Sequence, residues 1–193
     1  MAFHYDISVL ELLDILGCQP NPDYQPDPRL PVLLNDFLSR ALEHPLFETA
    51  DIWTCPDQFS HDAAENYLKI GSDYAAGVVE FGIREKDLDQ PDPPVCILHE
   101  GDPTGWTQLC PDLSSYLKYV LCAILCCETY ETGMEVLEEE DWCFEECEKP
   151  EDAPMTACLS DLAVCCGYDP DTHTILAILS NPQCTAFQIT KED

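Results

Sequence analysis

The segment GVVEFGIREKDLDQPDPPVCILHE, from Gly77 to Glu100, is the most informative about the fold class. Its two apolar runs are short, rich in β-branched and aromatic residues, and bounded by Gly, Pro and Asp, which is typical of β-strands. No helix-length segment separates the runs to carry a parallel crossover, so we expect the two strands to pair antiparallel. This part of the chain is therefore predicted to form an antiparallel sheet.

Similar runs on both sides extend the predicted sheet. ADIWTC (residues 50–55) and NYLKIG (residues 66–71) precede the stretch. Near the C-terminus, the runs DLAVCCGY, HTILAILS and CTAFQIT lie within residues 161–190 and are separated by turn residues. They predict a hairpin that extends into a meander.

Three helices are predicted to flank these strands. Capping-box spacing opens the first, a Leu-Pro pair opens the second and an aspartate caps the third, and apolar residues then recur at helical intervals. The helices run from Ser8 to Gly17, from Leu30 to Pro45 and from Asp112 to about Cys127. Together the elements predict a single domain over residues 1–193. Its expected fold is α+β, a mostly antiparallel sheet of about five or six strands flanked by helices.

The charge balance is strongly acidic. The chain has 38 Asp and Glu residues against 8 Lys and Arg, a formal net charge of −30. Such a balance disfavours nucleic acids and anionic membranes as partners, because both are bound through Lys and Arg. It favours association with a basic protein. The alternative is that the charge serves solubility alone.

Thirteen cysteines raise the question of disulfides or a metal site. The first residues lack the basic region of a signal peptide, so we expect a cytoplasmic protein with reduced thiols and no cofactor. The C-x3-C pairs Cys122/Cys126 and Cys143/Cys147 have enough thiolates for a tetrahedral zinc site. Because the first pair lies among Leu, Val and Ile, core packing is the favoured role. In the predicted strand holding Cys165-Cys166, one side chain is expected to face the core and the other outward.

No pattern indicates catalysis. The five histidines are scattered, and the sequence has no nucleophile elbow, phosphate-binding loop or dinucleotide fingerprint. His99-Glu100-Gly101-Asp102 lacks the second histidine of a metal-binding helix and is predicted to be a turn after a strand. The chain is therefore predicted not to be an enzyme.

One acidic stretch is a candidate binding surface. Between residues 138 and 146, two aromatic rings lie among six carboxylates, which would offer a basic partner both charge complementarity and anchors. The alternative is a solvated face whose rings dock it on the core. The candidate binding residues are Glu138, Glu139, Glu140, Asp141, Trp142, Glu145 and Glu146.

Several segments in this order resemble the SUKH superfamily, bacterial relatives of a fungal cell-wall synthesis regulator. The resemblance covers a Leu-Pro-led helix, a "GI-R-x-x-D-L" segment, a "DPPV" strand start and a Trp before a helix, within residues 30–127. The matching positions are Leu30, Pro31, Gly82, Arg84, Asp87, Pro94 and Trp106. The sequence departs from the family at Glu43-His44-Pro45, where a glycine loop is expected. The helix and connector in residues 1–29 and the acidic stretch and meander in residues 128–193 lie outside the match.

The resemblance implies an α+β fold without catalytic residues or cofactor. It also implies that Trp106 packs where the strands meet the third helix. Many members of the superfamily are implied to be immunity proteins that neutralise a cognate toxin, often a nuclease, by direct binding, and others are intracellular scaffolds. The leading hypothesis is thus an immunity protein. The alternatives are a regulatory adaptor and, third, a cysteine-dependent metal or redox protein.

Overall fold

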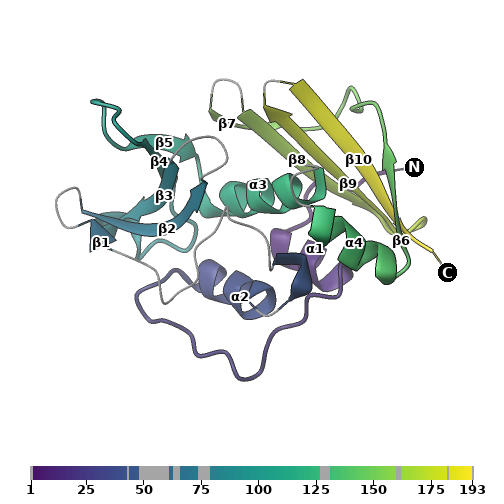
Figure 1. The fold of residues 1–193 in the computed structure, drawn as a ribbon, viewed down its shortest axis with the longest axis horizontal. Helices are drawn as coiled ribbons and strands as arrows, with labels where there is room; N and C mark the ends of the chain where they lie inside the picture. The colour runs from purple at the N-terminus through teal and green to yellow at the C-terminus, as the bar shows by residue number, and fades with distance from the viewer. Residues whose placement is uncertain are drawn as a thin grey trace.

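In the described residues, ten strands form two antiparallel sheets, with helices between and beside them (Figure 1). This computed structural model describes residues 2–42, 44–47, 61–62, 66–73, 79–126, 131–159, 162–181 and 183–192. The predicted α+β class is confirmed. The strands are divided between two sheets of five, where the sequence predicted one sheet of about five or six.

The first sheet has the strand order β1-β2-β3-β4-β5. Its strands are β1 (His61–Asp62), β2 (Tyr67–Asp73), β3 (Val79–Arg84), β4 (Val95–His99) and β5 (Thr107–Cys110). Each pairs antiparallel with the next, so the pairing predicted for the two runs of the central stretch is confirmed. The strand predicted at residues 50–55 lies outside the described residues. β5 was not predicted.

The second sheet has the order β6-β10-β9-β8-β7. Its strands are β6 (Trp142–Glu146), β7 (Thr156–Leu159), β8 (Leu162–Asp169), β9 (Thr174–Asn181) and β10 (Gln183–Lys191). The three long central strands are the predicted meander, which is confirmed. The two short edge strands, β6 and β7, were not predicted.

The helices are α1 (Val9–Ile15), α2 (Val32–Ala41), α3 (Leu113–Cys126) and α4 (Glu131–Glu139), with single 3-10 turns η1 (Pro45–Phe47) and η3 (Glu85–Asp87). The capping box of α1 is present, since Ser8 Oγ accepts from Glu11 N–H at 3.2 Å and the Glu11 carboxylate accepts from Ser8 N–H at 2.9 Å. Asp112 caps α3 by accepting from Ser115 N–H at 2.7 Å. Within the described chain, no helix has the length and apolar character needed to span a membrane.

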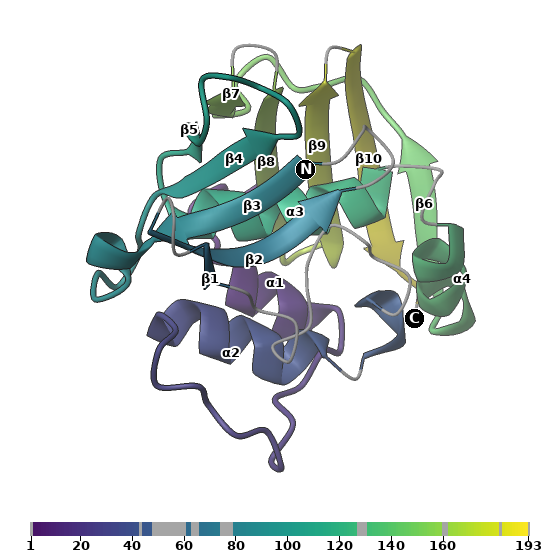
Figure 2. The same ribbon diagram turned by 60° about the vertical axis from the view of Figure 1, so that its left-hand side comes forward.

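Helix α3 lies between the two sheets (Figure 2). On one side its Tyr116 and Tyr119 rings contact Phe81 of β3, with centroids 5.4 and 6.3 Å apart. On the other side, the Cys122 sulfur lies 3.3 Å from that of Cys166 on β8. Burial on both sides explains why nearly every residue of α3 is apolar.

Both cysteines of the β8 pair are buried, which corrects the expectation that one faces outward. Cys166 faces α3, whereas Cys165 belongs to a small cluster on the other face of the sheet. The N-terminal segment covers that face, since Phe3 and Tyr5 pack there and His4 pairs with Tyr168. A face that alternation alone predicts to be solvated is therefore dry.

Candidate functional site

The acidic residues predicted to bind a partner are brought together at the end of α4 and along β6. We define the acidic surface as Glu138, Glu139, Glu140, Asp141, Glu145 and Glu146. All six side chains are exposed. Asp141 makes the turn between helix and strand with a φ of 64°, a left-handed conformation that Asp tolerates better than most residues. None of the six carboxylates forms an ion pair within the part of the chain that the structure describes.

Trp142 and Phe144 do not belong to this surface, which corrects their predicted role as anchors. Trp142 is only 4% exposed and lies in the main core, and Phe144 is partly buried against the same core. Lys191 of the neighbouring strand β10 lies over the Trp142 ring, with its Nζ 5.2 Å from the centroid. The two aromatic rings therefore dock β6 on the protein, and the exposed side chains of this segment are the carboxylates and Cys143.

The thiol of Cys143 lies beside the acidic surface and close to the Glu192 carboxylate. Cys143 is exposed on β6 between the two groups of carboxylates. A hydrogen bond to the Glu192 carboxylate, reinforced by the charges of Glu138 and Glu145, raises the pKa of the Cys143 thiol. Nearby anions disfavour a thiolate, so the site as built favours cations and opposes further negative charge.

The residues of the family motif lie in two places. Leu30 and Pro31 precede α2, and Leu30 is buried in the main core. Pro94 stands directly before β4 and is partly buried. Gly82, Arg84, Asp87 and Trp106 lie on or near strand β3 in the first sheet.

Trp106 is 8% exposed but packs on the face of the first sheet opposite α3. Its ring stacks on Tyr67 with centroids 4.5 Å apart and planes at 11°, in a small cluster with Cys96 that is separate from the main core. The expectation that Trp106 packs against the third helix is therefore wrong. Gly82 explains the placement, because a Cβ at this position would lie 2.8 Å from Trp106 Cη2.

Arg84 is positioned by the same aromatic stack. Its Nε donates to the Tyr67 hydroxyl at 2.7 Å, and its guanidinium carbon lies 5.8 Å from the centre of the Tyr67 ring. Asp87 is buried and accepts from Gln90 Nε2 at 2.8 Å, and the described residues show no ion pair between it and Arg84. Tyr67 was not identified from the sequence as a contact of Arg84. The alternation along its strand predicts only that its side chain lies on the face opposite Leu68 and Ile70.

No family model, curated protein or solved structure matches this chain. The SUKH resemblance thus stays a prediction, and the site is interpreted from its own geometry.

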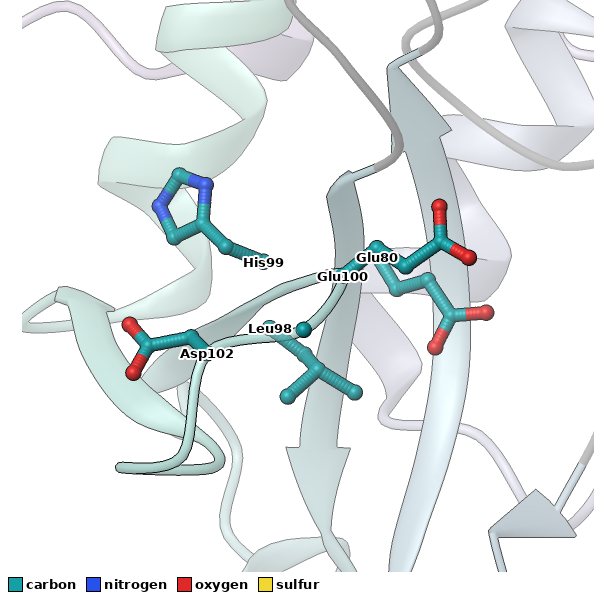
Figure 3. Close-up of a pocket in the computed structure, with 6 residues that line it drawn as sticks. Glu80, Leu98, His99, Glu100 and Asp102 are labelled. Carbon is teal, nitrogen blue, oxygen red and sulfur yellow. The ribbon is translucent and has the colours of Figure 1, made fainter.

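An acidic pocket of about 270 Å³, separate from the acidic surface, lies at the end of β4 (Figure 3). His99 and Asp102 lie on one side of it and Glu80 and Glu100 on the other, so the four side chains do not converge on one point. Glu80 is paired with Lys69 at 2.7 Å, and Asp102 accepts from the backbone and hydroxyl of Thr104 in the predicted turn. Within the described residues, no three His, Cys, Asp or Glu side chains are grouped to hold a metal ion.

The two cysteine pairs considered for zinc are in different environments. Cys122 and Cys126 are buried where α3 faces β8 and β9, and each sulfur contacts a backbone carbonyl of those strands. Cys143 is exposed on the edge strand β6, and Cys147 follows that strand. The spacing pattern alone could not reveal this separation.

Proposed function

We propose that this chain is a non-catalytic binding protein that recognises a basic protein partner through its acidic surface. One observation carries the proposal. Six exposed carboxylates, free of ion pairs within the described chain, lie on one continuous helix end, turn and edge strand. A partner's Lys and Arg side chains can pair with these carboxylates without breaking any ion pair that the structure records.

The charge of the whole chain supports the same proposal. With a formal net charge of −30, the protein attracts a basic partner over distances comparable to the Debye length and accelerates the encounter. Exposed carboxylates at the rim of an interface act mainly on the association rate. Because Trp142 is buried, the surface lacks an aromatic anchor, so we expect much of the affinity to depend on charge.

The resemblance to the SUKH superfamily suggests the kind of partner. We propose a cognate toxin, such as a nuclease, which the protein neutralises in the cytoplasm by covering a basic face. Nucleases carry such faces because they contact phosphates. In the alternative adaptor role the same surface would bind a protein of the host cell, and the two roles differ in the partner rather than in the site.

The test neutralises the surface without changing its shape. One variant carries Gln at Glu139, Glu140, Glu145 and Glu146. A matched control removes four other exposed carboxylates that make no side-chain hydrogen bond in the described chain, through Asp6→Asn, Asp36→Asn, Asp89→Asn and Glu100→Gln. Association with the product of the adjacent gene, or with a panel of basic nuclease domains, is measured from about 0.1 M to about 1 M salt, where the Debye length falls from about 10 Å to about 3 Å.

We expect association to slow with salt for the wild type and for the control. The surface variant should associate roughly tenfold more slowly at low salt and depend less on salt. Equal rates and equal salt slopes for the two variants would remove the acidic surface from the interface. Absence of binding to every basic partner would overturn the proposed function itself.

A further inference from the structure

A basic pocket on the first sheet is the feature that the proposed function leaves unexplained. The chain has only eight Lys and Arg residues, and two of them, Arg84 and Lys86, line one open pocket of about 550 Å³ with Asn66, Tyr67 and Glu85. Neither basic side chain forms an ion pair within the described residues. In a protein with 38 carboxylates, an arginine and a lysine that share a pocket and have no recorded acidic partner require an explanation.

The guanidinium of Arg84 is held in place before any ligand arrives. The Tyr67 hydroxyl accepts from Arg84 Nε at 2.7 Å. The ring of Trp106 stacks on the Tyr67 ring and restricts its movement. Trp106 can approach this closely because Gly82 has no Cβ. The terminal nitrogens of Arg84 have no hydrogen-bond acceptor in the described part of the chain. A fixed guanidinium with free terminal N–H groups is suited to receive a planar oxyanion through two parallel bonds.

The same stack holds an unpaired polar atom. Trp106 Nε1 is buried and has no hydrogen-bond partner in the structure, and within the described residues it is the only buried side-chain nitrogen or oxygen in that position. Proteins leave few such groups unpaired, because each costs about 1–3 kcal/mol. The stack that carries Arg84 thus includes one group whose hydrogen-bonding capacity the folded protein leaves unused, although the stack as a whole buries two large rings.

We propose that the pocket formed by Asn66, Tyr67, Arg84, Glu85 and Lys86 binds the carboxylate group of a small ligand. Arg84 accepts the carboxylate in a bidentate pair, and Lys86 contributes a second positive charge from the exposed side. This site is distinct from the acidic surface and does not depend on the proposed function.

Charge selects a carboxylate over a phosphate. The pocket holds two positive side chains and the carboxylate of Glu85, which leaves one net positive charge for a ligand. The surrounding protein, at −30, repels a dianion about twice as strongly as a monoanion. A ligand with one negative charge therefore fits the local charge with the smaller long-range penalty.

The probe is N-acetylphenylalanine at pH 7, which has one carboxylate beside an aromatic ring. Its uncharged amide and phenyl phosphate, a phosphate monoester that is mainly a dianion at this pH, are compared at constant ionic strength. Binding is followed by the backbone amide resonances of residues 84–86 in two-dimensional NMR. We expect saturable shifts with N-acetylphenylalanine, a dissociation constant in the millimolar range, no binding of the amide, and weaker binding of phenyl phosphate.

Two variants and one control locate the site. Arg84→Gln should weaken binding by roughly tenfold or more and the exposed Lys86→Gln by about threefold. Arg29→Gln also removes one positive charge, but from an arginine already paired with Asp27, and should leave binding unchanged. Equal affinities for Arg84→Gln, Lys86→Gln and the wild type, or absence of saturable shifts with N-acetylphenylalanine, would overturn the proposal. Tighter binding of phenyl phosphate would overturn the selection of a carboxylate.

Discussion

Replacing Gly82 with Ala tests the contact that places Trp106 on the outer face of the first sheet. The new Cβ would lie 2.8 and 2.9 Å from two Trp106 ring carbons and 3.1 Å from the backbone oxygen of Leu68. The ring cannot simply move away, because it is stacked on Tyr67 and only 8% exposed. Overpacking of this kind costs about 1–3 kcal/mol. In a domain of this size that lowers the melting temperature by roughly 2–4 °C per kcal/mol.

A double-mutant cycle isolates the contact. Trp106→Ala alone should destabilise the protein by about 3–5 kcal/mol, because it empties a large aromatic site. In the Trp106→Ala background, Gly82→Ala meets only the Leu68 backbone, so its cost should fall by about 1–2 kcal/mol. The free energies of unfolding are measured by urea denaturation followed by circular dichroism. If Gly82→Ala costs the same in both backgrounds to within about 0.5 kcal/mol, the contact does not determine the placement of Trp106.

Three further predictions concern single groups. Ser8→Ala removes the cap of α1 and should lower the free energy of unfolding by about 1 kcal/mol, measured by urea denaturation. Glu192→Gln removes the main cause of the raised pKa of Cys143, so alkylation of Cys143 at pH 8, followed by peptide mass spectrometry, should become faster; an unchanged rate would contradict the assigned hydrogen bond. Partial burial lowers the pKa of His44, so the unfolded chain binds a proton that the folded protein does not, and stability falls as the pH drops below about 6.5. Compared with the wild type, His44→Gln should lose less stability between pH 7 and pH 5, and equal losses would contradict this origin of the acid sensitivity.

The acidic surface could be predicted from the sequence only in part. Composition shows that residues 138–146 are acidic, and their aromatic residues indicate an ordered segment. Composition does not show which of the side chains face solvent, because that depends on where β6 pairs. Pairing with β10 turns Trp142 toward the core and leaves the carboxylates outside.

Elements with strong local signals could be predicted from the sequence. Capping residues, helical periodicity and turn residues located α1, α2 and α3, the central strands of the first sheet and the meander β8–β10, because these signals act over a few residues. Composition likewise determined the acidic character of the chain.

How those elements combine depends on contacts in the folded protein. The short strands β5, β6 and β7 carry weak local signals, and their partners stabilise them, so the division into two sheets was not visible in the sequence. Contacts between distant residues also decide which faces are dry. The N-terminal segment covers Cys165, and a ring from beyond β4 covers Gly82 and Tyr67. Such contacts link residues far apart along the chain, and no local pattern encodes them, because the free energy of burial depends on which surfaces meet in the folded protein.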